Sequence, residues 1–130
     1  MQMVIYLVAG LSLTWILYQL YVQLVSKSIE GRRADELQQL IPALEQTSQK
    51  ALIYCFSEAC APCRNMSPLI DKMHAEGKPI FKVDIVKHVD LAKDIGVQGV
   101  PTLLLIDHGI ITKVILGTQN RTRIEALLET

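Results

Sequence analysis

The chain has 130 residues, and its 13 basic residues balance its 13 acidic ones. A balanced charge without a basic stripe, together with few aromatic residues, excludes an electrostatic nucleic-acid-binding surface. Three cysteines, an odd number, argue against a scaffold held by structural disulfides. The first 26 residues carry no charged side chain. The sequence therefore divides into an apolar segment and a charged remainder that is long enough for one compact domain.

The N-terminal segment contains an uncharged run from Met3 to Val25. As a helix this run would extend roughly 35 Å, enough to cross a hydrocarbon core of about 30 Å. We therefore expect residues 1–26 to form a transmembrane anchor that contacts the lipid bilayer through residues 3–25. A cleaved signal peptide and a buried core helix are the alternatives. The start of the chain lacks a basic residue and a small-residue cleavage site, and the run is long for a core helix.

The charges that follow this run predict its orientation. Lys27, Arg32 and Arg33 come after it, and only the α-amino group precedes it. The positive-inside rule then predicts a single-pass membrane protein whose soluble domain lies in the cytoplasm. An extracytoplasmic domain is the alternative. We assign residues 27–33 to a polar linker and residues 34–130 to the soluble domain.

The soluble part alternates between helical and strand-like patterns. In chain order we expect a helix over 34–48 with a break at Pro42, a strand over 51–56, a helix over 64–75 kinked at Pro68, a strand over 80–86, a helix over 90–95 ended by Gly96, strands over 102–106 and 110–116, and a closing helix from Asn120 to Glu129. This order predicts an α/β sandwich in which crossovers join parallel strands and one hairpin strand is added.

Cys60 and Cys63 stand between the first of these strands and the helix that follows it. A helix N-terminus favours negative charge, and the thiolate is the reactive form of cysteine. The placement predicts redox chemistry with Cys60 as the nucleophile and Cys63 as the resolving thiol. Half of a zinc site is the alternative, although no second pair of suitably spaced ligands is present. We expect neither a metal nor an organic cofactor.

Several separated segments resemble the thioredoxin family in order and spacing. The matching segments are the active-site turn Cys60-Ala61-Pro62-Cys63, the helix-kinking Pro68, the strand residues Lys82-Val83-Asp84, the segment Gly96-Val97-Gln98-Gly99-Val100-Pro101-Thr102 that resembles the part carrying the family's cis-proline, and Gly117, which matches the glycine bordering the substrate groove. The resemblance covers roughly residues 34–130. It implies a thioredoxin-like sandwich with a roughly four-stranded mixed sheet.

The same resemblance implies an activity and a set of partners. We expect a thiol–disulfide oxidoreductase that acts as a membrane-tethered protein-disulfide reductase. Its partners would be disulfide-containing substrate proteins and an electron donor that recycles the Cys60–Cys63 disulfide. The docking lip for the substrate would consist of Ala61, Pro62, Val100, Pro101 and Gly117. A strand-start proline is the alternative reading of Pro101, in place of a cis bond that exposes the backbone of Val100.

Several residues depart from the family pattern. Tyr54 stands where the family usually has a buried aspartate that takes the proton of the resolving thiol, so Tyr54, Lys82 and Glu58 are the candidate tuning residues. Ala59 replaces the usual tryptophan before the first cysteine. These departures motivate a second hypothesis, a membrane-anchored interaction or assembly module with little turnover. A dedicated reductant of an exported apoprotein, such as a cytochrome, is a third. Cys55 is expected to pack in the core.

Overall fold

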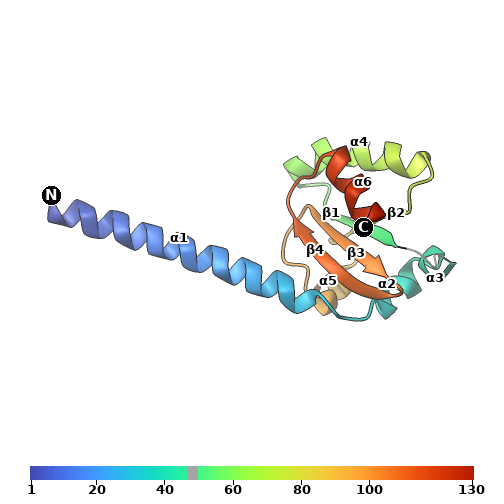
Figure 1. Ribbon diagram of the computed structural model, residues 1–130, viewed down its shortest axis with the longest axis horizontal. Helices are drawn as coiled ribbons and strands as arrows, with labels where there is room; N and C mark the ends of the chain where they lie inside the picture. The colour runs from blue at the N-terminus through green and yellow to red at the C-terminus, as the bar shows by residue number, and fades with distance from the viewer. Residues whose placement is uncertain (47–49) are drawn as a thin grey trace.

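We describe residues 1–46 and 50–130 of a computed structural model of the chain (Figure 1). Its centre is a four-stranded sheet in the order β2-β1-β3-β4. The strands are β1 (Ala51–Phe56), β2 (Ile80–Asp84), β3 (Thr102–Asp107) and β4 (Ile110–Leu116). Strand β1 pairs parallel with β2 and antiparallel with β3, and β3 and β4 form an antiparallel hairpin. The predicted α/β fold with a four-stranded mixed sheet is therefore confirmed.

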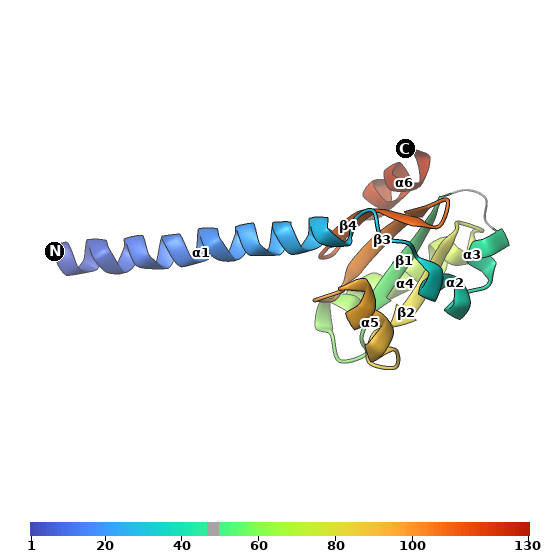
Figure 2. The same ribbon diagram turned by 90° about the horizontal axis from the view of Figure 1, so that it is seen from below.

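Helices cover both faces of this sheet (Figures 1 and 2). The helices are α1 (Gln2–Ile29), α2 (Asp35–Leu40), α3 (Ala43–Gln46), α4 (Ala61–Ala75), α5 (Val89–Ile95) and α6 (Arg121–Glu129). One apolar cluster joins the sheet to α4 and α6, and the other joins it to α2, α3, α5 and the end of α1. This sandwich explains why β1 is a continuous apolar run, since a strand covered on both faces has no solvated side.

Alternation along β1 assigns its side chains to the two faces. Leu52 and Tyr54 belong to the cluster with α4, whereas Ile53 and Cys55 belong to the opposite cluster. All four side chains are buried. Successive side chains of a strand point to opposite faces, so neighbours in the sequence enter different surroundings.

The largest differences from the expected helix and strand boundaries lie in three elements, while α5 begins one residue earlier and β3 ends one residue later than expected. The helix expected over 34–48 is divided at Pro42 into α2 and α3, and its expected last residues fall among residues 47–49, which lie outside the described residues. Helix α4 begins at Ala61 rather than Arg64 because the active-site turn already forms its first turn. Strand β2 ends at Asp84 rather than Val86, because the Asp84 carboxylate accepts the Val86 N–H at 2.9 Å.

Two helix ends follow the expected local chemistry. Helix α5 ends at Gly96, whose φ of 86° lies in the left-handed region that glycine tolerates best. Helix α6 is preceded by Asn120, whose side-chain oxygen accepts the Arg123 N–H at 2.9 Å. This hydrogen bond satisfies one of the unpaired donors at the start of the helix.

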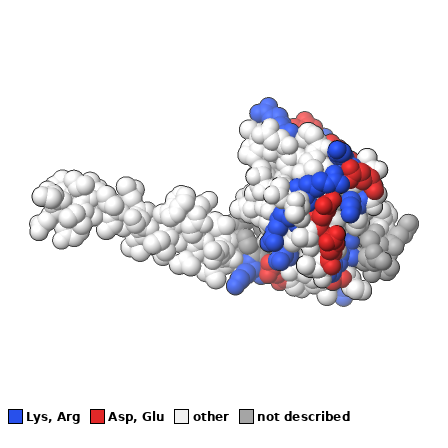
Figure 3. Space-filling model, turned by 45° about the horizontal axis from the view of Figure 1, so that its top comes forward, with Lys and Arg blue, Asp and Glu red and all other residues white. Residues whose placement is uncertain are grey.

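Helix α1 is a single helix of 28 residues that projects away from the domain (Figures 1 and 2). No residue of its most apolar window is buried. Figure 3 shows no Lys, Arg, Asp or Glu along the projecting part, whereas both signs are interspersed over the domain. The length and composition of α1 are sufficient to cross a membrane, and N-terminal signal and targeting sequences share both properties. The structure therefore establishes a long apolar N-terminal helix.

The residues after α1 lie against the domain. Ile29, at the end of α1, is 3% exposed and joins one of the two core clusters. The Gly31 N–H donates to the Ile111 carbonyl at 2.7 Å, and the Ile111 N–H donates to the Arg32 carbonyl at 2.9 Å. The Arg32 guanidinium also donates to the Asp94 carbonyl at 2.9 Å. These contacts hold the end of α1 and the segment that follows it to the edge strand β4 and to α5.

Candidate active site

Cys60 and Cys63 form a disulfide at the start of α4, with Cα atoms 5.2 Å apart. Cys60 is the N-cap residue, and its Sγ accepts the Cys63 N–H at 3.2 Å. Pro62 lies in the first helical turn, where its missing N–H costs no intrahelical hydrogen bond. The local sequence thus places both sulfurs at the positive end of a helix of 15 residues.

The two cysteines differ in accessibility. Cys63 is 1% exposed, whereas Cys60 is half-buried and the intervening Ala61 and Pro62 are exposed. A molecule that approaches the disulfide from solvent therefore meets the Cys60 sulfur first. Attack at the more accessible sulfur is what thiol–disulfide exchange requires of a reactive position.

The loop before β3 forms the second wall of the site. The Val100–Pro101 peptide bond is cis, as the family resemblance implies. The Val100 carbonyl oxygen lies 3.7 Å from the Cys60 Sγ. The Gly117 N–H donates to the Pro101 carbonyl at 2.8 Å, so the end of β4 closes on the same loop. Gly117 has a φ of 98°, a conformation that favours glycine. The structure thus brings Val100, Pro101 and Gly117 together beside the disulfide.

Tyr54 lies under the active-site helix. Its hydroxyl donates to the Cys63 carbonyl at 3.2 Å and is 3.2 Å from the Ser67 Oγ. Its ring stacks on Phe56 with a centroid separation of 5.6 Å. Tyr54 is fully buried, so a polar hydroxyl without these partners would be costly there. Tyr54 therefore contacts the backbone of the resolving cysteine.

The other two candidate tuning residues have ion-pair partners of their own. The Lys82 Nζ is 2.8 Å from an Asp71 carboxylate oxygen and lies 4.9 Å from the centroid of the Phe56 ring. Glu58 is exposed and pairs with Lys87 at 3.4 Å. The hydrogen bond that the Lys87 ammonium donates to the Glu58 carboxylate raises the pKa of that ammonium. Lys82 and Glu58 thus lie near the active-site turn, but each forms its ion pair with another side chain and not with a cysteine.

Cys55 is the free thiol of the described chain. It is 2% exposed, and burial raises its pKa from 9.0 to about 12. It belongs to the core cluster on the face of the sheet opposite α4. The expectation that Cys55 packs in the core is confirmed, because a thiol that keeps its proton and meets no solvent is inert.

Two residues of the site were not among the sequence-based candidates. Ser67 lies one helical turn after Cys63 and contacts the Tyr54 hydroxyl. Thr102 is buried, and its hydroxyl donates to the Gly99 carbonyl at 2.7 Å. This hydrogen bond joins the two ends of the short segment that contains Pro101. The helical spacing from Cys63 was a usable signal for Ser67. Thr102 directly follows Pro101, but a hydrogen bond across the loop has no signature in the sequence.

The zinc alternative has no support from the geometry. The Cys60 and Cys63 sulfurs are bonded to each other. Within residues 1–46 and 50–130, no group of three or more His, Cys, Asp or Glu side chains is placed to hold a metal ion. A C-x-x-C disulfide that caps a helix beside a cis-proline instead defines the class of thiol–disulfide oxidoreductases.

Comparison with known proteins gives the family. The thioredoxin family model matches residues 25–130, and the chain belongs to the thioredoxin family. Mouse mitochondrial thioredoxin is 38% identical over 73 residues, which cover 54% of this chain and 44% of that protein. The thioredoxin of Alicyclobacillus acidocaldarius is 27% identical over 86 residues, covering 64% of this chain and 82% of that one. The match therefore spans less than half the length of the mitochondrial relative.

Solved structures agree with this assignment. The X-ray structure of Fasciola hepatica thioredoxin superimposes with a TM-score of 0.62 at 26% identity, covering 74% of this chain and 91% of that one. The family exchanges disulfides through a C-x-x-C pair, and Cys60–Cys63 is that pair in this chain. The predicted class of thiol–disulfide oxidoreductase is confirmed.

Proposed function

We propose that the protein is a membrane-tethered protein-disulfide reductase. The observation that carries the proposal is the unequal exposure of the two sulfurs at the N-terminus of α4. Cys60 is half-buried and faces the loop with the cis peptide bond, and Cys63 is 1% exposed behind it. An accessible thiol next to a protected one supports ordered attack and resolution.

The reaction proceeds in two exchange steps. The reduced Cys60 thiolate attacks one sulfur of a substrate disulfide, a mixed disulfide forms, and the other substrate sulfur leaves as a thiolate. Cys63 then loses its proton and attacks the Cys60 Sγ, which releases the second substrate sulfur and leaves the Cys60–Cys63 disulfide. Two electrons pass to the substrate. A dithiol or other two-electron donor must then reduce the protein again.

The substrate docks at the lip formed by Ala61, Pro62, Val100, Pro101 and Gly117. The first two residues are exposed beside Cys60, and the last three meet around the cis peptide bond. The Val100 carbonyl near the Cys60 sulfur supports pairing of this loop with an extended substrate backbone. A proline at position 62 and an apolar residue at position 100 are more typical of family members that reduce disulfides than of members that introduce them.

Tyr54, Lys82 and Glu58 tune the thiols in this proposal. The Tyr54 hydroxyl fixes the Cys63 carbonyl and so holds the backbone of the resolving cysteine. Lys82 and Glu58 act at longer range, because their closest charged partners are Asp71 and Lys87. Removing an exposed charge would change the field at the disulfide only modestly.

The proposed layout has an anchor over residues 1–26, a connection over 27–33 and a thioredoxin-like domain over 34–130. The exposed apolar length of α1 supports the anchor, and the basic residues after it favour a cytoplasmic domain. A removable targeting sequence is the competing role for α1. The mass of the protein isolated from cells distinguishes the two, because an anchor is retained and a targeting sequence is cut off.

Insulin reduction by the full chain in detergent micelles tests the activity. We expect turnover with a dithiol donor, loss of turnover in Cys60→Ser, and a trapped mixed disulfide in Cys63→Ser. Cys55→Ala is the matched control, because its thiol lies on the opposite side of the sheet. A folded wild-type protein without turnover would contradict the reductase and favour the interaction or assembly module, which the Tyr54 replacement motivates.

Labelling of intact cells tests the orientation. A membrane-impermeant alkylating reagent, applied after reduction, should modify Cys60 only once the membrane is permeabilised. Modification before permeabilisation would instead place the domain outside the cytoplasm. That outcome would favour the dedicated reductant of an exported apoprotein.

A further inference from the structure

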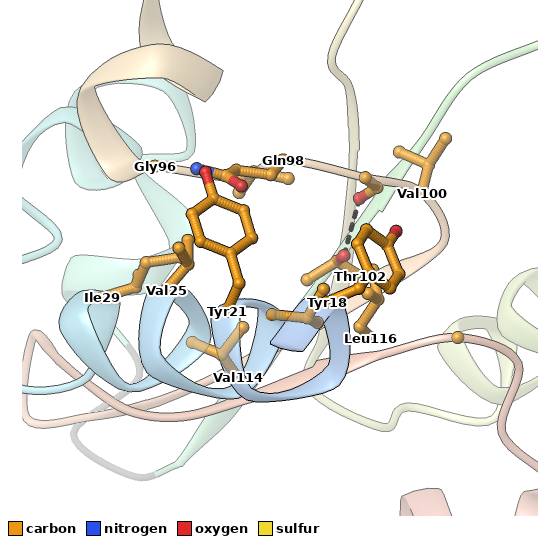
Figure 4. A pocket seen from close by; sticks show the side chains of 14 residues that line it. Tyr18, Tyr21, Val25, Ile29, Gly96, Gln98, Val100, Thr102, Val114 and Leu116 are labelled. Carbon is orange, nitrogen blue, oxygen red and sulfur yellow. Dashed lines mark hydrogen bonds between the residues drawn. The ribbon is translucent and has the colours of Figure 1, made fainter. Parts of the chain in front are cut away.

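A cavity of about 410 Å³ lies between the C-terminal half of α1 and the active-site side of the domain. Figure 4 shows Tyr18 and Tyr21 of α1 facing the segment that carries Gly96, Gln98 and Val100, and Leu116 of β4 lies beside Tyr18. The volume is in the range of ligand pockets in proteins, about 300–1,000 Å³. None of the residues that line the cavity is charged. Helix α1, which looks like an anchor separate from the domain, thus forms one side of this cavity.

Both walls of the cavity are held in place by specific contacts. Ile29 is buried, and a Cβ at Gly96 would lie 3.2 Å from the Ile29 side chain, so the end of α1 packs closely on the loop after α5. The Val114 N–H donates to the Glu30 carboxylate at 3.3 Å. Together with the backbone pairing of Gly31 to β4, these contacts fix the angle at which α1 leaves the domain.

The cavity is continuous with the docking lip. Val100 and Gly117 line it, and the Val100 carbonyl oxygen is 3.7 Å from the Cys60 Sγ. Gly117 is hydrogen-bonded to Pro101 on the same loop. A substrate chain whose cysteine reaches Cys60 therefore has its flanking residues at the mouth of the cavity. Its extended backbone would advance about 3.3 Å for each residue toward Tyr18 and Tyr21.

We propose that this cavity binds the apolar residues that flank the reactive cysteine of a substrate polypeptide. The substrates it selects are proteins whose disulfide lies beside an apolar, uncharged stretch, such as the end of a membrane-inserted segment. The proposal rests on the reductase activity proposed above. Charged flanking residues are disfavoured, because the lining offers no counter-charge to replace the lost water.

A polypeptide fits the cavity better than a lipid chain. The aliphatic lining of Val22, Val25, Val114 and Leu116 suits either occupant. The tyrosine hydroxyls and the Gln98 amide add hydrogen-bonding groups that a peptide backbone satisfies and an acyl chain does not.

Two disulfide-containing peptides test the proposal. Both carry the same cysteine pair, followed in one by Leu-Val-Leu and in the other by Ser-Gly-Ser. The full chain in phosphatidylcholine nanodiscs is assayed for kcat/KM with each peptide, and the ratio of the two values is the preference. We expect Tyr21→Ser on α1 and Leu116→Ser on β4 each to lower the preference by about tenfold, because burying one apolar side chain favours binding by that order.

Leu24→Ser is the matched control. Leu24 lies on α1 next to the lining residues but does not itself line the cavity. The preference should be unchanged in this variant, which also corrects for partition of the apolar peptide into the nanodisc lipid. An unchanged preference in both Tyr21→Ser and Leu116→Ser, with both peptides still reduced, overturns the cavity proposal and leaves the reductase intact. Reduction of neither peptide by the wild-type protein overturns both.

A second measurement does not depend on the folding of these variants. The apolar peptide, carrying a photoreactive leucine in its flank, is trapped as a mixed disulfide on Cys63→Ser and irradiated. Cross-links to the stretch from Tyr18 to Val25 support the proposal. Cross-links confined to the outer side of α4 overturn it, as does labelling of the same stretch by a photoreactive phosphatidylcholine that the trapped peptide fails to displace.

Discussion

Two regions of the molecule hold thiols within eight residues of one another, and their chemistry is opposite. The interior of β1 holds Cys55, which is 2% exposed and whose pKa burial raises to about 12. The start of α4 holds Cys60, half-buried at a helix N-terminus and bonded to Cys63. The residue type is the same in both. Access to solvent and the direction of the nearest peptide dipoles decide which thiol reacts.

Tyr54 connects the two regions. It is the neighbour of Cys55 on β1, but its side chain points to the other face and reaches the Cys63 carbonyl. Alternation along one strand therefore sends one residue into an inert core and the next to the active-site helix. Four predictions test whether the chemistry of the two regions is independent.

The largest effect is expected at Cys60. Cys60→Ser should lower protein-disulfide reduction by about a thousandfold or more, because the nucleophile that forms the mixed disulfide is lost. Cys55→Ala should retain the activity. The insulin assay measures both. If Cys60→Ser kept activity within tenfold of the wild type, the division between a reactive and an inert thiol would be wrong.

Alkaline pH should affect the buried region next. Cys55 keeps its proton in the folded state up to about pH 12, while in the unfolded chain it ionises near pH 9.0. Its contribution to stability is therefore complete below pH 9 and lost between these values. The difference in the free energy of unfolding between the wild type and Cys55→Ala should shift against the wild type by roughly 2–3 kcal/mol by pH 11.

Urea unfolding at pH 7, 9 and 11 measures this shift. The variant serves as the control for every other group that titrates in the same range. Parallel pH profiles for the two proteins would show that the Cys55 thiolate is no less stable in the fold than in the unfolded chain, and the burial argument would fail.

The connection between the regions should give a smaller effect. Tyr54→Phe removes the hydroxyl that bonds the Cys63 carbonyl and contacts Ser67. We expect a loss of about 1–2 kcal/mol in the free energy of unfolding, because buried partners are left unsatisfied. We also expect slower release of substrate from the mixed disulfide. Stopped-flow measurement of that release separates the second effect from the first, since a purely structural role changes only the unfolding midpoint.

The smallest effect is expected at the far end of α4. Arg121 of α6 forms a two-pronged ion pair with Glu76, the C-cap residue of α4, and this pair lowers the pKa of the Glu76 carboxyl. The ion pair stabilises the folded protein at pH values above the pKa that the Glu76 carboxyl has in the unfolded chain. This stabilisation is lost as the pH falls and the carboxyl is protonated. Glu76→Gln should lower the Tm slightly at neutral pH, and about 1 M salt should remove the difference. A lower rate of insulin reduction in Glu76→Gln would show instead that the far end of α4 influences its active-site end.

The sequence predicted the elements that depend on local chemistry. The apolar run of β1, the glycine that ends α5 and the asparagine before α6 each indicate their structure through neighbouring residues alone. The disulfide and the cis peptide bond before Pro101 followed from the family resemblance, because the C-x-x-C pair and the Val-Pro-Thr segment are specific in combination. The helix boundary at α4 was set too late, because its first turn is also the active-site turn.

What the sequence did not reveal depends on contacts between distant segments. The pairing of Gly31 with Ile111 uses backbone groups, which every residue carries, so no side-chain pattern marks it. The partners of the Tyr54 hydroxyl depend on how α4 crosses β1. The cavity between α1 and the loop around Val100 depends on the first of these contacts, since the pairing of Gly31 with Ile111 fixes the end of α1 to β4.

The attachment of α1 to β4 makes the whole chain a rigid lever. A helix advances about 1.5 Å and turns about 100° for each residue. The length of α1 therefore sets both the distance of the disulfide from the N-terminal end of the helix and its rotation about the helix axis. One residue inserted after Leu20 would raise the domain only slightly but turn the active site well away from its present azimuth. The number of residues in α1 thus determines both how far the active site lies from the N-terminal end and the direction in which it faces.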